Sequence, residues 1–304
     1  MPAITRGNIG RQLYEGLRTL WGLEVDRYQD EWKEFLEVNT SKKAFEQEVA
    51  LSGFGSGAVK PEGSQVTYDE ANEFYVSTYR PVTYALAFAI TEEAIEDNLY
   101  MEMGKRYTKA LGWSMKNTKE VVCASILNNA FSGSYLGGDG VALCSTSHPT
   151  YSGGGVNANR PATDVDLSET ALENAVIGIG AWTDQRGLLM AVKPKKLIVP
   201  NANSFAADKL LNTVLKVDSA DNTINSIMHR GSIPGGYAVC HYLTDTDAWF
   251  ITTDAPDGLK YFDRVPLKFS QEGDFDTGNM RFKARCRFAA GWTNPLGIYG
   301  TQGA

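Results

Sequence analysis

The stretch that decides the fold of this chain runs from Thr91 to Phe131 and reads TEEAIEDNLYMEMGKRYTKALGWSMKNTKEVVCASILNNAF. One stripe of residues recurs every three or four positions, the spacing that keeps side chains on one face of an α-helix. The stripe runs through Ile95, Leu99, Met103, Tyr107, Leu111, Met115, Thr118, Val122 and Ile126. At ~1.5 Å per residue the whole stretch would span roughly 60 Å as a single helix, which indicates an elongated subunit.

The other positions of this stretch indicate how the helix begins and which face is polar. Thr91 can cap the first turn, and acidic residues follow it, where the helix dipole favours anions. The face opposite the stripe is expected to be charged, with Lys105, Arg106, Lys109, Lys116 and Lys119. Gly104 and Gly112 each weaken a helix by about 1 kcal/mol relative to Ala, so a bend or break near Gly112 is the alternative.

Composition bounds the class of protein. The chain has 304 residues, of which 43% are hydrophobic and 21% charged, enough for one elongated unit or two compact units with a real core. Its formal charge of −7 argues against a protein that binds nucleic acid over its whole surface, although a local basic face remains possible.

The sequence favours a protein of the cytoplasm. Its apolar runs are too short or too interrupted by charge to cross a bilayer, and the amino terminus lacks the pattern of a signal peptide. The cysteines are scattered among apolar or small residues, so we expect buried free thiols at Cys123, Cys144, Cys240 and Cys286.

The residues before the long helix suggest an arm and a hairpin. Ile9–Phe35 is amphipathic and rich in aromatic residues, which suits an arm that docks on its own domain or on a neighbouring subunit. Residues 48–72 are glycine-rich and polar at their centre. Val49–Phe54 and Gln65–Tyr68 can be extended, which predicts a long hairpin with a loose tip and no core of its own.

Two strands have faces of contrasting character. Val82–Ile90 alternates large apolar residues with Thr and Ala. Met280–Phe288 alternates apolar residues with four cations, Arg281, Lys283, Arg285 and Arg287. We expect the apolar face of Met280–Phe288 to pack on the stripe of the long helix, which leaves the four cations together on the opposite face.

A second unit is expected after a glycine-rich loop over residues 132–161. Its predicted elements are a helix from Asp166 or Ser168 to about Gln185, a buried strand Leu197–Val199, a helix Ser204–Leu215, and a hairpin of Tyr237–Leu243 with Ala248–Thr252.

The sequence offers little support for a catalytic, metal or cofactor site. A zinc site would need Cys144, His148, Cys240 and His241, but adjacent Cys240 and His241 would point to opposite faces of a strand. Neither a Gly-x-Ser-x-Gly elbow nor the Gly-Lys-Ser/Thr ending of a phosphate loop occurs. A soluble metal-dependent hydrolase is therefore the disfavoured alternative.

Several motifs resemble those of one protein family. They are Leu143–Pro149 with the glycines 153–155 and Asn159–Pro161, Trp182–Gly187 with Pro194–Pro200, and Gly291–Gly300. Together they resemble the major capsid proteins of tailed bacteriophages, which have the Hong Kong 97 type fold, and most closely the Mu-like major head subunits. The resemblance covers nearly the whole chain.

The resemblance implies an α+β capsid fold with five parts. Residues 1–47 would be the N-terminal arm and 48–79 the extended E-loop hairpin. Residues 80–163 would be the peripheral domain, with the spine helix 91–131, a sheet and the linker. Residues 164–263 would form the apical α/β domain, and 264–304 would return to the peripheral domain.

The resemblance also implies a structural function without catalysis. Copies of the chain would form hexamers and pentamers of a closed icosahedral head around double-stranded DNA, with a separate scaffolding protein and a portal as further partners. The protein would be found in the virion after assembly in the host cytoplasm, with no membrane partner. An encapsulin-like bacterial nanocompartment, which shares this fold, is the alternative.

The row of four cations requires anions, either packaged DNA or the acids of a neighbouring E-loop. We favour the E-loop because in this family it lies across the adjacent peripheral domain. The candidate contacts between subunits are Phe54, Lys60, Glu62, Asp69, Glu70, Glu73, Arg281, Lys283, Arg285 and Arg287. Covalent cross-linking through Lys60 has weak support, since a lysine at a loop tip is normally only solvated.

Overall fold

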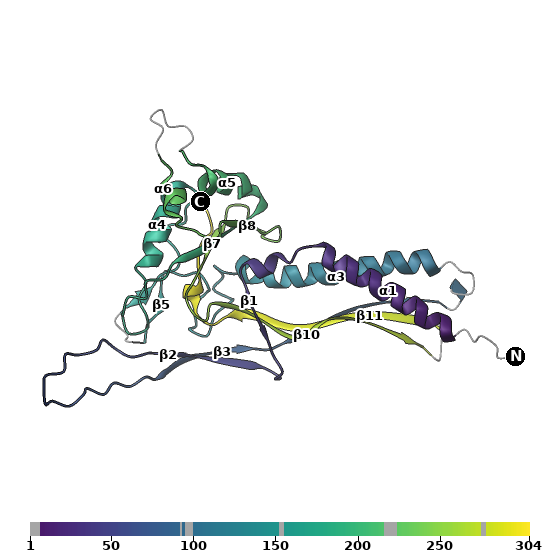
Figure 1. Ribbon diagram of the computed structural model, residues 1–304, viewed down its shortest axis with the longest axis horizontal. Coiled ribbons are helices and arrows are strands. Elements are labelled where there is room, and N and C mark those ends of the chain that lie inside the picture. Colours follow the sequence, from purple (N-terminus) through teal and green to yellow (C-terminus); the bar gives the residue numbers. More distant parts are fainter. Residues whose placement is uncertain (1–6, 92, 95–99, 152–154, 216–223, 275–277) are drawn as a thin grey trace.

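Two four-stranded sheets lie in two arms of the molecule that meet at a corner, and a long hairpin extends from that corner (Figure 1). The computed structural model describes residues 7–91, 93–94, 100–151, 155–215, 224–274 and 278–304. The elongated shape agrees with the expectation drawn from the long helix. None of the helices in these residues is long and apolar enough to cross a membrane.

The first sheet has the strand order β1, β10, β11, β4. These strands span Glu37–Thr40, Leu259–Gly273, Met280–Trp292 and Val82–Ile90. β10, β11 and β4 pair antiparallel, whereas β1 pairs parallel with β10. Helices α1 (Gly7–Arg27) and α3 (Tyr100–Asn128) cover one face of this sheet (Figure 1). The sheet and these two helices are called the first unit below.

The long helix is continuous from Tyr100 to Asn128, so neither Gly104 nor Gly112 breaks it. A Cβ atom at Gly112 would lie 3.3 Å from the ring of Trp21, so this glycine allows α1 to pack closely on α3. Thr91 Oγ1 accepts the backbone N–H of Ala94 at 3.3 Å, as a capping residue does. The predicted helix also includes positions 92 and 95–99, among them Ile95 and Leu99, and these lie outside the described residues.

The stripe of α3 packs on the apolar face of β11, as predicted. Leu111, Met115 and Ile126 are buried in one core with Phe282 and Phe288. This burial is the main favourable term for the first unit, at about 1.5–3 kcal/mol for each large apolar side chain. Tyr107 departs from the prediction, since 47% of it is exposed at the edge of the sheet.

The prediction of a charged face opposite the stripe holds for Lys105, Arg106 and Lys109, which are exposed, but is wrong for the next two turns. Lys116 is buried and its Nζ donates to the carbonyl oxygen of Val25 at 2.7 Å. The Nζ of Lys119 lies 4.4 Å from the centre of the Trp32 ring. Here the N-terminal segment folds over the helix, which its own periodicity does not reveal.

The N-terminal arm docks on its own unit. Leu17 and Trp21 of α1 are buried, and the Trp21 ring stacks on Phe269 of β10 at 5.3 Å. The 3-10 helix η1 (Glu31–Glu34) follows α1 and leads into β1, which joins the sheet. Of the two locations left open for the arm, the structure shows the intramolecular one.

The second sheet has the strand order β12, β9, β7, β8. The strands span Ile298–Thr301, Trp249–Thr253, Pro194–Val199 and Tyr237–Val239, and the helices α4, α5 and α6 span Glu169–Gly180, Ser204–Asn212 and Ser226–Arg230. Ser168 caps α4, as predicted, by accepting the N–H of Ala171 at 3.2 Å. This sheet and its helices are called the second unit below.

The strand order corrects two expectations. The predicted hairpin of Tyr237–Leu243 with Ala248–Thr252 is wrong, because β7 lies between β8 and β9. All residues of β9 are buried, as a central strand requires. At the end of the chain, β12 pairs with β9, so 298–301 belong to the second sheet rather than returning to the first. The helix α4 also ends at Gly180, before the expected Gln185.

The remaining elements are short. β5 (His148–Pro149) pairs with β6 (Val156–Asn157) in the linker between the units. The 3-10 helices η2 (Asn201–Asn203) and η3 (Pro295–Gly297) precede α5 and β12.

A buried asparagine in the linker ties the linker to the last residues of the chain, which enter the second unit. The Nδ2 atom of Asn159 lies near three main-chain oxygens, those of Leu143 (2.7 Å), Pro295 (2.8 Å) and Ile298 (3.0 Å). Its Oδ1 accepts the N–H of Ser145 and lies 3.0 Å from Nε2 of His148. Because this oxygen can only accept, Nε2 of His148 carries a hydrogen. The other ring nitrogen lies 2.6 Å from Asp139 Oδ2.

We predict that Asn159→Ala strongly destabilises the subunit, because it leaves several buried polar groups without partners. The expected loss in free energy of unfolding is about 3 kcal/mol or more, measured by urea denaturation of the soluble subunit. Asn212→Ala is the control, since within the described residues the Asn212 side chain bonds to Asp208 alone, in an exposed position. Equal losses for the two variants would contradict the proposed role of Asn159.

The four cysteines are buried, as predicted, and none is in a disulfide. Burial raises the pKa of Cys240 to about 11 and also raises the pKa of Cys123, Cys144 and Cys286. Because the thiolate is the reactive form, we expect a thiol reagent to label the native subunit very slowly at pH 8. After denaturation it should label four thiols, and a lower count would contradict the prediction.

Candidate functional site

The long hairpin consists of β2 (Glu46–Leu51) and β3 (Glu73–Tyr79), which pair antiparallel. Residues 52–72 between them contain neither strand nor helix, as the glycine-rich composition predicted. The returning limb Gln65–Tyr68, expected to be extended, pairs with no strand of the described residues. The facing limb carries Gly53, Gly55 and Gly57, which disfavour strand formation. Residues 52–72 are called the loop tip below.

The base of the hairpin is fixed to the first unit. Lys260 Nζ lies 2.6 Å from Glu48 Oε1 and 2.7 Å from Asp257 Oδ1. Burial lowers the pKa of Lys260, but the bonds to Asp257 and Glu48 outweigh burial and raise this pKa overall. The hydroxyl of Tyr75 donates to the carbonyl oxygen of Thr293 at 3.0 Å. The direction in which the hairpin leaves the body is therefore set by β10 and the end of β11.

Asp69 gives the loop tip a defined shape. Its carboxylate accepts the N–H groups of Gly55 (2.6 Å) and Glu70 (2.9 Å), and these bonds lower the pKa of Asp69. Arg186 of the second unit lies 2.7 Å from the same carboxylate and also donates to the carbonyl oxygen of Glu70. Within one subunit, Asp69 therefore already has a cationic partner. Its role in a contact between subunits stays a prediction.

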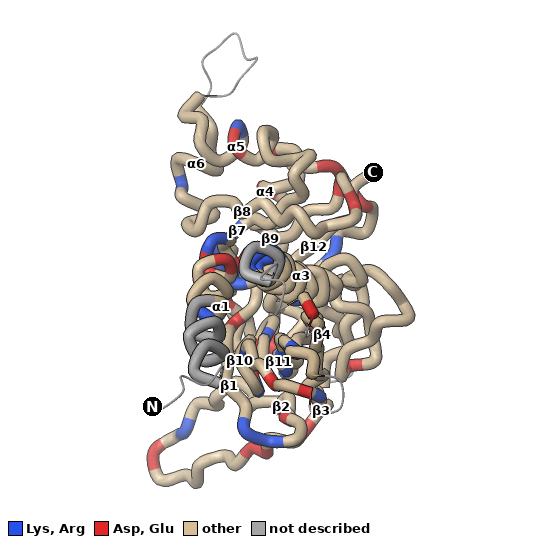
Figure 2. The backbone as a smooth tube through the Cα atoms, turned by 90° about the vertical axis from the view of Figure 1, so that its right-hand side faces the viewer, with Lys and Arg blue, Asp and Glu red and all other residues tan. Residues whose placement is uncertain are grey.

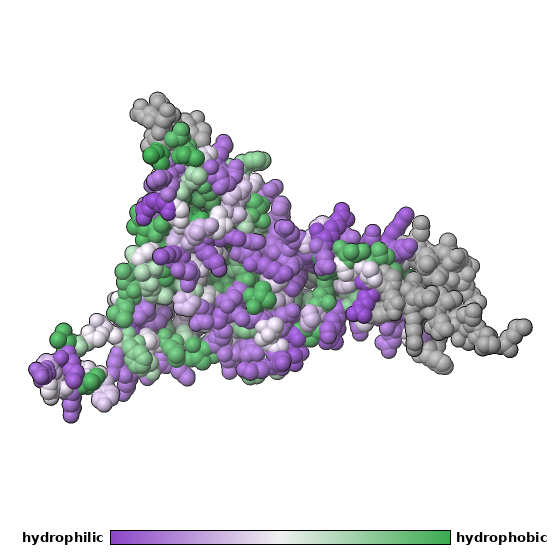
Figure 3. All heavy atoms as spheres, in the orientation of Figure 1, coloured by the Kyte–Doolittle hydropathy of each residue, from purple (hydrophilic) through white to green (hydrophobic). Residues whose placement is uncertain are grey.

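The loop tip exposes apolar side chains that a single subunit does not cover. Val59 and Tyr68 are each 94% exposed, and Phe54 and Val66 are each more than 60% exposed. Figure 3 shows hydrophobic residues at the end of this extension, beside hydrophilic ones. Lys60 and Glu62 are exposed at the same end. Burying such side chains against another surface is favourable by ~25 cal/mol per Å² of apolar area, which suits a contact with a partner.

The outer face of the first sheet carries the row of cations, as predicted. Along β11, residues 281, 283 and 285 are exposed whereas 282, 284 and 286 are buried. The register sets Arg281, Lys283 and Arg285 opposite Ala89, Ala87 and Ala85 of β4. Because alanine side chains are short, the cationic side chains extend beyond their neighbours on β4. Figure 2 shows Lys and Arg residues along β10 and β11.

The cations of this row differ in what they contact. Arg281 forms an ion pair with Asp274, and Arg287 Nε donates to the carbonyl oxygen of Pro81 at 3.3 Å. In the part of the chain that the structure describes, Lys283 and Arg285 have no ion-pair partner. Lys268 of β10 stands directly opposite Arg285, which adds like-charge repulsion. Lys268, Lys283 and Arg285 together are called the basic face below.

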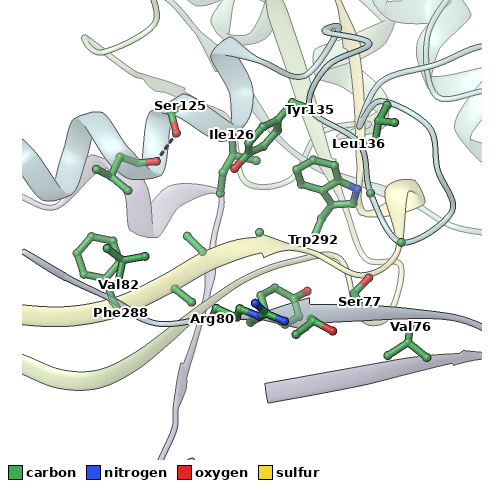
Figure 4. A pocket seen from close by; sticks show the side chains of 18 of the residues that line it. Val76, Ser77, Arg80, Val82, Ser125, Ile126, Tyr135, Leu136, Phe288 and Trp292 are labelled. Carbon is green, nitrogen blue, oxygen red and sulfur yellow. Dashed lines mark hydrogen bonds between the residues drawn. The ribbon is translucent and has the colours of Figure 1, made fainter. Parts of the chain in front are cut away.

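A groove of about 520 Å³ lies beside the hairpin base, between α3, residues 135–138 and the end of β11. In Figure 4 the Trp292 ring lies beneath Tyr135, with Arg80 on the opposite wall. The two rings are 5.6 Å apart. The described lining residues include apolar and hydroxyl groups but no carboxylate, imidazole or thiol. Chemistry that depends on a carboxylate, an imidazole or a thiol would therefore have no group to carry it in this groove.

The residues of the hydrolase alternative do not form one site. Cys144 is buried, His148 is bonded within the linker, and His241 contacts Glu31 on the far side of the junction. Among the described residues there is no group of three or more His, Cys, Asp or Glu positioned to hold a metal.

Sequence reasoning missed two residues of these surfaces. Lys268 was detectable, because Lys268, Ser270 and Glu272 alternate with Leu267, Phe269 and Gln271 in the same way as the residues of β11. Arg186 was not detectable, since its contact with Asp69 joins residues more than a hundred positions apart.

Comparisons with known proteins agree with this architecture. A family model described as "Phage capsid protein" matches residues 75–301, whereas no curated protein sequence matches the chain. The virus-like particle from Pyrococcus furiosus has a TM-score of 0.53 at 13% identity, covering 95% of this chain and 98% of that one. The capsid of Myoviridae Phage XM1 has a TM-score of 0.52 at 11% identity, covering 88% and 90%.

The capsid of a native GTA particle is similar in the same way, with a TM-score of 0.54 at 11% identity and 91% of each chain covered. At such identities the structural matches show the shared fold alone, and they confirm the expected capsid fold of the Hong Kong 97 type. The family model spans most of the sequence, and this chain therefore belongs to the phage capsid protein family.

Proposed function

We propose that this chain is the repeating structural subunit of an icosahedral phage head that encloses double-stranded DNA. The match of residues 75–301 to the phage capsid family carries this proposal. Copies of the chain form its hexamers and pentamers, assembled in the host cytoplasm with a separate scaffolding protein and a portal. The chain has no catalytic function of its own under this proposal, in keeping with its membership of the phage capsid protein family.

The contact between subunits that we propose joins the loop tip of one copy to the basic face of the next. The tip supplies exposed acids, Glu62 and Glu70, and Glu73 follows at the start of β3. The basic face supplies Lys283 and Arg285, which lack an ion-pair partner in the described subunit, and the repulsion between Lys268 and Arg285 is relieved when anions arrive. Each exposed pair contributes about 0.2–1 kcal/mol, so the contact acts by repetition across the shell and weakens with salt.

A second candidate is an encapsulin-like compartment, because the similarity to solved structures, among them the virus-like particle from Pyrococcus furiosus, shows the fold and both kinds of shell share it. Electron microscopy of the purified protein tests both, because each requires closed shells. Shells that contain DNA in infected cells support the head, shells filled with a cargo protein support the compartment, and the absence of shells under all assembly conditions contradicts both.

We predict that replacing residues 56–67 with a short Gly-Ser linker leaves the subunit folded but prevents shell formation. These residues add no core, and the replacement keeps the contacts of Gly55 and Asp69. The measurements are thermal unfolding of the subunit and sedimentation of assembled material. Lys42→Ala, at an exposed position outside the loop tip, is the control and should assemble normally. Loss of the cooperative unfolding transition would show that the loop tip belongs to the core.

We further predict that Lys283→Glu combined with Arg285→Glu impairs the assembly of empty shells, because the neighbouring loop tip then meets like charge. Glu70→Lys with Glu73→Lys in the same chain should partly restore assembly. The yield of empty shells is measured by sedimentation at low and high salt. If the first pair of changes leaves empty shells intact and lowers only DNA retention, the basic face contacts DNA and the loop contact is wrong.

A further inference from the structure

The N-terminal segment crosses the junction of the two units at η1. This short helix lies between α3 of the first unit and, in the second unit, β7 and the residues after β8. A cavity of about 530 Å³ opens here, lined by residues of all these elements, among them Asp30, Glu31, Lys116, Lys196 and His241. The two units are therefore not close-packed on each other at this point, in contrast to an ordinary protein interior.

On the side of the first unit, η1 is held by buried contacts. Glu120 of α3 is 4% exposed, and its two oxygens accept the N–H groups of Glu31 (3.0 Å) and Trp32 (3.1 Å). A carboxylate at these N–H groups is a charge-assisted cap. The Trp32 side chain is buried and its ring lies 4.3 Å from the ring of Tyr261. Removing any of these groups would leave a cavity or an unpaired buried polar atom.

On the side of the second unit, the contacts of η1 are polar and exposed. Glu31 accepts the N–H of His241 at 2.8 Å, and its other oxygen lies 2.7 Å from Nδ1 of the same residue. Glu34 forms an ion pair with Lys196. The side chain of His241 is 59% exposed and that of Glu34 44%. Exposed ion pairs of this kind are weak and break easily.

Elsewhere the junction is packed. Phe131, just beyond α3, stacks on Phe250 of β9 at 5.7 Å, and the buried Asn159 joins the linker to β12 of the second unit. This part of the junction provides a pivot, and η1 contacts the second unit to one side of it.

We propose that η1 is a latch: fixed to the first unit by Glu120 and Trp32, it holds the second unit at a set angle through Glu31 and Glu34, and releases it when these two contacts break. Under the proposed shell function, on which this role rests, the latch limits the range of angles that one chain adopts at different positions of the shell.

Hydrogen–deuterium exchange of the isolated subunit tests the latch without any assembly. In Glu31→Ala with Glu34→Ala, the amide of His241 should exchange about tenfold faster or more, and it should also exchange faster in Glu34→Ala alone, which keeps Glu31 as the acceptor of this N–H. The amides at positions 31 and 32 should keep their wild-type rates because Glu120 still holds them. The measurement is made at pH 8, since burial raises the pKa of Glu120 to about 7. Glu24→Ala is the control, because Glu24 pairs with Arg27 within α1.

Two outcomes would overturn the latch. A wild-type exchange rate at His241 in Glu34→Ala alone shows that η1 does not hold the second unit through this ion pair. Faster exchange at positions 31 and 32 as well shows that η1 is not fixed independently to α3. Swapping the two charges, with Glu34→Lys and Lys196→Glu in one chain, should make hydrogen exchange at His241 slower than in Glu34→Lys alone. If it does not, the ion pair between Glu34 and Lys196 is not part of the latch.

Assembly supplies a second and independent readout. Shells of the double alanine variant should show a broader distribution of diameters in electron micrographs than shells of the wild type or of Glu24→Ala. An unchanged distribution overturns the role of the latch in the shell. If the wild-type chain forms no shells, the proposed function fails, while the exchange experiment still decides whether the latch exists.

Discussion

The packing of the inner face of β11 on α3 is the constraint on which the rest of the subunit depends. Phe282 and Phe288 enter the same core as Leu111 and Met115, and successive side chains of a strand point to opposite faces. A shift of one residue would bury Lys283 and Arg285 and expose both phenylalanines, at prohibitive cost. The hydrophobic core therefore fixes the basic face on the outside of the sheet, although no cation takes part in the core.

The same strand carries this constraint to the hairpin and to the second unit. Where β11 ends, Thr293 accepts the hydroxyl of Tyr75 and contacts Glu48, so the base of the hairpin is aligned on the sheet. A few residues later, the carbonyl oxygens of Pro295 and Ile298 bind Asn159. One core thus sets the positions of the loop tip, the basic face and the second unit relative to one another.

The features that sequence could predict are those set by short-range periodicity. The helical stripe, the two-faced strand Met280–Phe288 and the glycine-rich loop tip all follow from spacing within one segment. The burial of Lys116 depends instead on a segment about ninety residues away, whose carbonyl groups replace water around the ammonium. The insertion of β7 beside β9 and the pairing of Asp69 with Arg186 likewise join distant residues, which no local pattern encodes.

The contact of Asp69 with Arg186 bears on how a loop without a core can bind at all. An extended loop loses conformational entropy when it docks, and that cost opposes weak ion pairs of about 0.2–1 kcal/mol each. Asp69 already closes the tip onto Gly55, and Arg186 ties it to the second unit before any partner arrives. Part of the conformational entropy of the loop tip is therefore lost during folding and not on docking, which favours docking through Glu62, Glu70 and Glu73. Because Arg186 belongs to the second unit, the direction of the loop tip also depends on the angle between the two units, which we propose is held by η1.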